Sequence, residues 1–131
     1  MRKRQNPDFS ESISVVCRMF DDAVKDYEWS KDKIEEANLL TQDYLHSLEL
    51  DGLKYDERAK LATQLAKCRQ ERRAHKDTMM ILEPLVQYLG TDKGKQLVNL
   101  LREVLGKTRR VEEQMKNRVY YPRVLGRDHK E

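Results

Sequence analysis

The sequence predicts an all-α fold, an elongated antiparallel three-helix coiled-coil bundle followed by an extended C-terminal tail. Three observations lead to this prediction. Apolar residues recur at alternating steps of three and four along three segments, which is the spacing of a coiled-coil seam. Glycine-containing breaks separate these segments. Charged residues make up 37% and aromatic residues 7% of the 131 residues, a composition typical of long helices with solvated faces.

The first helix is expected over residues 8–50. Pro7 suits a first helical turn, and Ser10 and Ser12 offer hydroxyl oxygens as caps. The helix is expected to end at Asp51-Gly52, because glycine adopts the left-handed conformation easily. The apolar seam lasts for about five heptads. It consists of Ile13, Val16, Phe20, Ala23, Tyr27, Ser30, Ile34, Ala37, Thr41, Tyr44 and Leu48.

Two more helices are expected over residues 54–89 and 92–117. Pro84 should kink the second helix without ending it, since the seam continues beyond it. Gly90 should end that helix, and Thr91 offers a cap to the third. Gly94 and Gly106 each weaken the third helix by roughly 1 kcal/mol relative to Ala. The two seams consist of Leu61, Leu65, Cys68, Arg72, His75, Met79, Leu82, Val86 and Leu89, and of Leu97, Leu101, Val104, Thr108, Val111 and Met115.

The two ends of the chain are expected to lie outside the bundle, which spans residues 7–117 as a single domain. Residues 1–6 form a basic N-terminus that we expect to be flexible. Residues 118–131 form the predicted tail, because Pro122 restricts the residue before it to extended conformations.

Short turns should make consecutive helices antiparallel neighbours, and the seams define a register for both pairs. Ala37 then pairs with Cys68 between the first two helices. Thr108 lies beside His75 between the second and third, so Ser30, His75 and Thr108 share one layer. Their polar groups can hydrogen-bond to one another. This layer either fixes the register of the bundle, as polar seam residues do, or forms a ligand site.

Basic side chains around this layer suggest an anion site in the middle of the bundle. The predicted register brings the basic residues of the second and third helices to one height, and the tail adds two arginines. A phosphate-bearing ligand or a nucleic-acid backbone suits such a cluster. The candidate anion-binding residues are Arg69, Arg72, Arg73, His75, Lys76, Lys107, Arg109, Arg110, Arg118 and Arg123. The alternative is a solvated basic face that the acidic first helix balances.

The same register leaves the turn end of the first hairpin without a third neighbour. The third helix should end near the height of Cys68, so apolar residues beyond it need the tail or a second chain to cover them. The candidate partner-binding residues are Leu40, Tyr44, Leu48, Leu61, Val119, Tyr120 and Tyr121. Within the tail, the two tyrosines fit an apolar cover or a surface on which bases stack.

No residue pattern favours catalysis, a metal site or a cofactor. Cys17 and Cys68 lie at or beside the seams, where thiols are usually inert, and no nucleotide or zinc motif occurs. We therefore expect no enzymatic activity. No segment approaches the ~20 apolar residues that span a bilayer, and no secretory signal follows the basic start. These absences predict a cytoplasmic protein that does not act at a membrane.

A non-enzymatic interaction or assembly protein is the function that these features favour, acting on a protein partner or by self-association as a homo-oligomer. Small, charged, helical proteins of this type are common among bacterial and phage accessory factors. The alternative is an anion-binding protein that takes nucleic acid or a nucleotide at the mid-bundle basic cluster.

Overall fold

The computed structural model describes residues 8–124, and its secondary structure consists of α1 (Phe9–Leu50), α2 (Tyr55–Leu89) and α3 (Asp92–Lys116). The prediction of an all-α chain with three helices is confirmed. Most of the packing between helices joins α1 to α2. The predicted flexible N-terminus, residues 1–6, and the end of the predicted tail, residues 125–131, lie outside the described residues.

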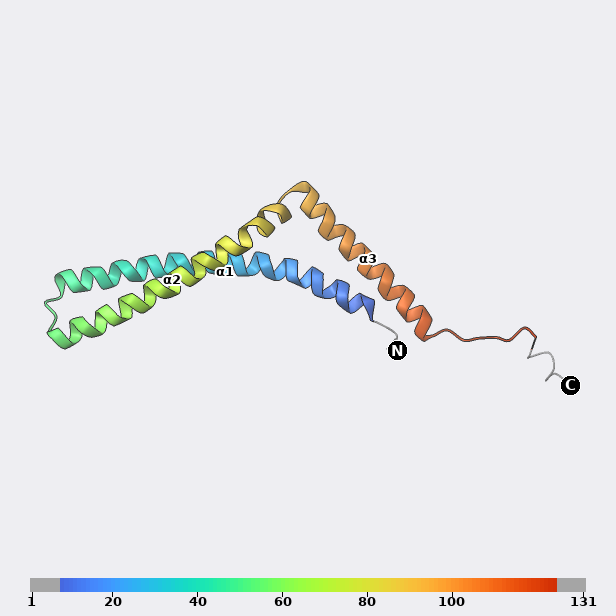
Figure 1. Cartoon of the computed structure of the whole chain (residues 1–131), viewed down its shortest axis with the longest axis horizontal. Helices are drawn as coiled ribbons and strands as arrows, with labels where there is room; N and C mark the ends of the chain where they lie inside the picture. Colours follow the sequence, from blue (N-terminus) through green and yellow to red (C-terminus); the bar gives the residue numbers. More distant parts are fainter. Residues whose placement is uncertain (1–7, 125–131) are drawn as a thin grey trace, which may run out of the picture.

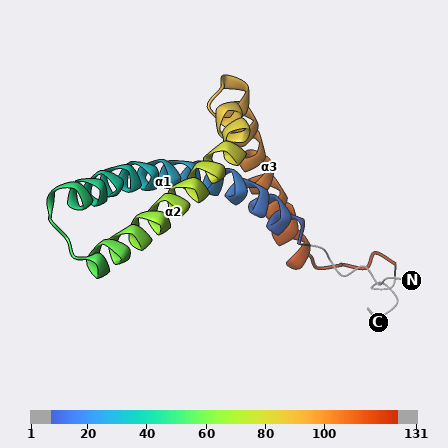
Figure 2. The ribbon, with the colours of Figure 1, turned by 60° about the vertical axis from the view of Figure 1, so that its left-hand side comes forward.

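α1 and α2 form a long antiparallel hairpin, and they lie side by side in both ribbon views (Figure 1 and Figure 2). The chain turns at Gly52, whose φ of 51° is left-handed, as the sequence predicted. The Cys68 thiol donates to the carbonyl oxygen of Ala37 at 3.5 Å, and the His75 ring meets the Trp29 ring edge-on with 5.0 Å between centroids. These contacts confirm the predicted register of the hairpin around Cys68.

α3 lies against the N-terminal half of α1 and runs antiparallel to it. The Ser10 backbone N–H donates to Glu112 Oε1 at 2.8 Å, and Arg102 Nη2 lies 3.2 Å from Asp21 Oδ1. The predicted register of the third helix, which placed Thr108 beside His75, is therefore wrong. The three helices do not lie side by side along the whole length of the molecule. Instead, α1 has α2 beside its C-terminal half and α3 beside its N-terminal half.

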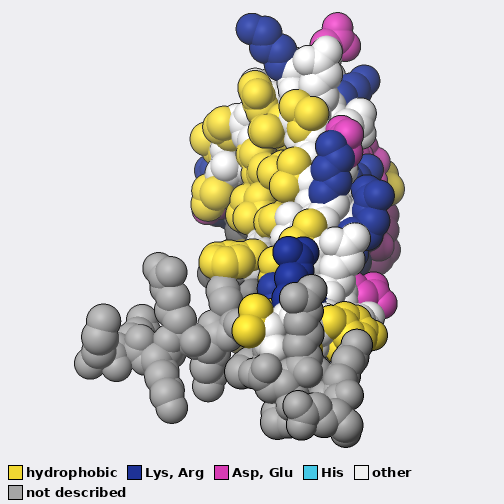
Figure 3. Space-filling view, turned by 90° about the vertical axis from the view of Figure 1, so that its right-hand side faces the viewer, with side chains coloured by type: hydrophobic (Ala, Val, Ile, Leu, Met, Phe, Trp, Pro, Cys, Tyr) yellow, Lys and Arg dark blue, Asp and Glu magenta, His cyan; other side chains and the backbone are white. Residues whose placement is uncertain are grey.

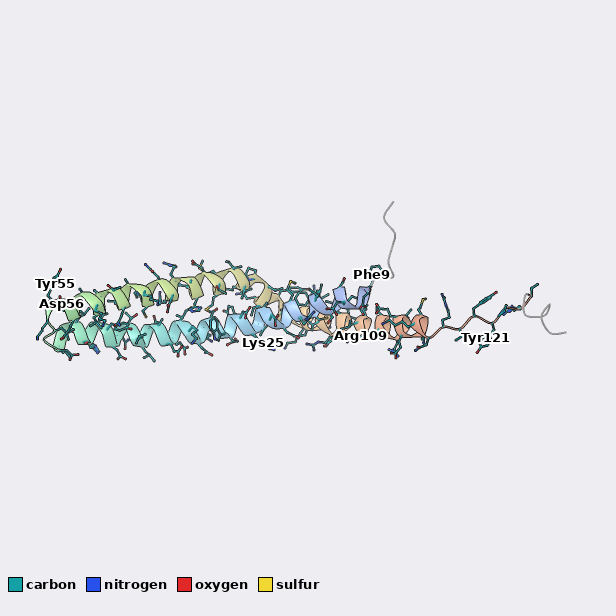
Figure 4. All side chains as sticks on the ribbon, turned by 90° about the horizontal axis from the view of Figure 1, so that it is seen from below. Phe9, Lys25, Tyr55, Asp56, Arg109 and Tyr121 are labelled. Carbon is teal, nitrogen blue, oxygen red and sulfur yellow. The ribbon has the colours of Figure 1, made fainter. Side chains whose placement is uncertain are left out.

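The corner between α2 and α3 determines the direction in which α3 leaves α2. α2 continues through Pro84, and its axis bends toward its C-terminal end (Figure 4). Thr91 then caps α3 by accepting from the Gly94 N–H at 3.1 Å. A methyl group on Gly94 would overlap the carbonyl oxygen of Tyr88 and the Cα of Leu89. The first turn of α3 thus rests on the last turn of α2, which sends α3 away from α2 and not back along it.

The buried positions of all three helices are small residues. They are Ser10, Cys17, Ala23, Ser30 and Ala37 on α1, Cys68 on α2 and Gly94 on α3. On α1 they recur every seven residues, except for the step of six between Cys17 and Ala23. One residue fewer turns the stripe by about 100° around the helix. This is the point at which α1 changes its neighbour from α3 to α2.

The stripe that α3 turns toward α1 agrees only in part with the predicted seam. The less exposed positions of α3 after its first turn include the predicted residues Leu97, Leu101 and Thr108, and also Val98, Leu105 and Glu112. The predicted seam residues Val104, Val111 and Met115 are 47–58% exposed.

The two glycines inside α3 provide a test of the corner. Gly94→Ala should destabilise the chain by roughly 1–3 kcal/mol, because the added methyl group has no room against α2. Gly106→Ala is the matched control. A methyl group there meets nothing within 4 Å, so this change should stabilise α3 by about 1 kcal/mol. Chemical unfolding followed by circular dichroism measures both. Equal effects of the two substitutions would contradict the close approach at Gly94.

Candidate interaction surfaces

A hydrogen-bonded cluster joins the start of α1 to the end of α3. The Glu112 carboxylate accepts from both the backbone N–H and the hydroxyl of Ser10, at 2.8 and 2.7 Å. The first N–H groups of a helix have no partner within that helix, so Glu112 caps α1 from another element. The predicted capping by the hydroxyl oxygens of Ser10 and Ser12 is wrong. Asp8 occupies the N-cap position without a side-chain cap bond of its own.

Asp8 extends this cluster. Its Oδ1 lies 2.7 Å from the Ser10 hydroxyl, which has one proton and therefore donates to one carboxylate at a time. The hydrogen bond that the Ser10 hydroxyl donates, aided by the positive charge of Lys116, lowers the pKa of Asp8 from its ordinary value of 3.8. The ionised form of Asp8 is thus the one that the folded chain favours.

The predicted polar layer of Ser30, His75 and Thr108 does not form. Thr108 lies on the stripe that α3 turns toward the start of α1, and His75 packs against Trp29. Ser30 is 1% exposed, and its hydroxyl has no hydrogen-bond partner. A buried hydroxyl without a partner costs free energy. The small size of Ser30 therefore allows close packing at the seam, while its unpaired hydroxyl destabilises the folded chain.

The candidate anion-binding residues fall into two separate groups. One group lies on α2 and consists of Arg69, Arg72, Arg73, His75 and Lys76. The other lies on α3 and in the segment after it, and consists of Lys107, Arg109, Arg110, Arg118 and Arg123. His75 packs against Trp29 and Arg102 contacts Asp21, which places even the nearest members of the two groups roughly 20 Å apart along α1 at 1.5 Å per residue. In Figure 4, Arg109 lies near Phe9 and far from Tyr55.

The shared height that suggested one anion site is therefore absent from the described residues. Arg72 has a role within the hairpin instead. Its Nε donates to Asn38 Oδ1 at 2.7 Å, and it lines a cavity of about 340 Å³ between α1 and α2 together with Ile34 and Met79. Sequence periodicity placed Arg72 on the seam, but it did not identify the amide that binds it.

The candidate partner-binding residues of the hairpin differ in exposure. Leu40 is 43% exposed, whereas Tyr44, Leu48 and Leu61 are half-buried along the seam between α1 and α2. Further large apolar side chains are exposed toward the turn, where α3 does not reach (Figure 1). They are Leu39, Leu45, Leu50 and Tyr55. We call Leu39, Leu40, Leu45 and Leu50 the hairpin leucines.

The described part of the tail, residues 118–124, does not cover the hairpin leucines. Residues 118–122 form neither helix nor strand, and Val119, Tyr120 and Tyr121 are 65–82% exposed. The tail leaves α3 at the end of the molecule opposite the hairpin turn (Figure 1). Among the described residues, the first of the two ways to cover the hairpin that the sequence suggested is absent, and cover by a second chain stays a prediction.

A second apolar surface lies on one side of the α1/α3 pair. It consists of Phe9, Val16 and Met19 on α1 and of Leu100, Val104, Val111 and Met115 on α3, each 38–62% exposed. At about 100° per residue these side chains follow one flank of each helix. In the space-filling view, hydrophobic side chains gather along one side of this end, and Lys and Arg along the other (Figure 3). We call this surface the bare α1/α3 face.

Sequence reasoning missed this surface because it placed Val16, Val104, Val111 and Met115 inside the bundle. The signal was present in the width of the apolar arc on α3. The apolar side chains of α3 occupy an arc of about 160° of its circumference, bounded by Val98 and Leu100. One neighbouring helix cannot cover an arc of this width.

No three His, Cys, Asp or Glu side chains among residues 8–124 come together as metal ligands, and none of the described helices is long and apolar enough to span a membrane. Comparison with protein-family models, with curated proteins and with solved structures finds no significant match to the chain. The surfaces therefore carry the functional argument.

Ser30→Ala should stabilise the chain by about 1 kcal/mol, because it removes a buried hydroxyl without a partner and keeps the small volume of the seam. Ser14→Ala, at a half-buried position of the same helix, measures the gain in helix propensity alone. The difference in unfolding free energy between the two variants isolates the effect of burial. Loss of stability in Ser30→Ala would show that the hydroxyl has a partner.

The lowered pKa of Asp8 makes the hydrogen-bonded cluster of Asp8, Ser10 and Glu112 sensitive to acid. A carboxyl group whose pKa is lower in the folded chain adds stability above its unfolded pKa, and this stability is lost as pH falls through the folded pKa. Between roughly pH 5 and pH 2, the midpoint temperature of thermal unfolding should fall by more for the wild-type chain than for Asp8→Asn. Parallel pH curves for the two proteins, at equal concentration, would contradict this role of Asp8.

Proposed function

We propose that the protein is a non-enzymatic assembly factor that acts through protein–protein contacts, as small bacterial and phage accessory proteins do. One observation carries this proposal. The helix seams bury small residues, and most of the large apolar side chains stay exposed on the described surface. Soluble monomers rarely expose contiguous apolar patches beyond a few hundred Å². A chain built in this way buries its apolar surface against other protein.

The hairpin supplies a contact for a partner protein. It extends away from α3 (Figure 1), so its turn end is accessible from several sides. Leu45 and Leu50 are 49% and 74% exposed, and the acidic residues Asp43 and Glu49 lie next to them in the exposed part of α1. Apolar anchors with a polar rim are typical of specific protein interfaces.

Site-specific photo-crosslinking tests the hairpin contact. A photoreactive phenylalanine analogue at Leu45 of the full chain, expressed in its own cells, should give a covalent product with a partner other than this chain. Gln64 is the matched control, because it is exposed on the other helix of the same hairpin. Mass spectrometry identifies the product.

Competition makes the test specific. An excess of unlabelled wild-type chain should suppress the product. An equal excess of unlabelled Leu40→Glu chain should suppress it several-fold less, because a carboxylate in the contact is costly to desolvate. Equal products from Leu45 and Gln64, or no product at either position, would contradict a partner contact at the hairpin leucines.

A further inference from the structure

The bare α1/α3 face continues an interface that the chain already forms. Ala37 lies against Cys68 of α2, and Val16 precedes Ala37 by three heptads, so both lie on the same side of α1. α2 departs toward its corner with α3 before it reaches Val16, which is 38% exposed. The stripe that binds α2 along the hairpin thus lacks a neighbour at the N-terminal end of α1. An antiparallel or parallel helix placed there extends the same packing.

The face has the size that a dimer requires. A fully exposed large apolar side chain presents roughly 150–200 Å², so the side chains of this face, each 38–62% exposed, present on the order of 600 Å² per copy. A stable dimer of standard size buries about 800 Å² on each partner, of which the rim is polar. The apolar stripe together with a polar rim reaches that value.

We propose that two copies of this chain pair through the bare α1/α3 face. The second copy takes the side of α1 that α2 leaves free. The inference rests on the proposed function in that the chain works through protein contacts, and it assigns the face opposite the hairpin turn to self-association.

Sedimentation equilibrium of the full chain tests the pairing. The wild-type chain should show a monomer–dimer equilibrium with a monomer of 15.6 kDa. Val104→Glu should raise the dissociation constant at least tenfold, because it buries a carboxylate in the apolar stripe. Leu45→Glu on the hairpin is the matched control and should leave the dissociation constant unchanged. Circular dichroism checks that both variants keep their helices.

A wild-type chain that stays at 15.6 kDa at every concentration, or a dimer that Leu45→Glu disrupts and Val104→Glu does not, overturns the pairing through this face. Neither result affects the crosslinking test at Leu45, which detects a different chain. Conversely, a dimer with the predicted response and no crosslinked partner supports self-association and contradicts the hairpin contact. The two proposals can therefore fail separately.

Discussion

The structure depends on a stripe of small side chains along α1 that allows other helices to approach its backbone closely. Ser10, Cys17, Ala23, Ser30 and Ala37 are the buried positions of this helix, and their near-heptad spacing keeps them in line. Close approach gains many weak dispersion contacts, but it leaves the larger apolar side chains on the flanks of the seam. The feature that holds the helices together is thus also the reason that so much apolar surface stays exposed, which is the basis of both functional proposals.

Two local contacts decide where α3 lies. Gly94 lets the first turn of α3 rest on the end of α2, and Glu112 closes the other end by capping α1 at Ser10. Between these points the buried stripe of α1 turns to a new side, since the step from Cys17 to Ala23 is six residues. α2 and α3 therefore contact different sides of α1. A continuous heptad would have kept both on one side, where they would compete for the same surface.

The hairpin could be predicted from the sequence because its information is periodic. The seams of the first two helices and Gly52 determine their register, and Cys68 does contact Ala37. The position of α3 could not be predicted in this way, because its apolar arc is wide enough for two stripes to fit a neighbour equally well. The choice depends on backbone contact at Gly94 and on a cap from Glu112, and apolar periodicity contains neither. The anion site depended on that register and separated into two groups with it.

The two ends of the molecule differ in the partner that each selects. At the hairpin end, the leucines lie on several sides of α1 among acidic residues, a distribution that suits a partner with separate pockets. At the α1/α3 end, apolar residues form one stripe along both helices. A stripe of this kind is matched by a helix pair of similar length that has an apolar stripe of its own. A second copy of the chain supplies such a pair, so the simplest complement of this face is the same face of another copy.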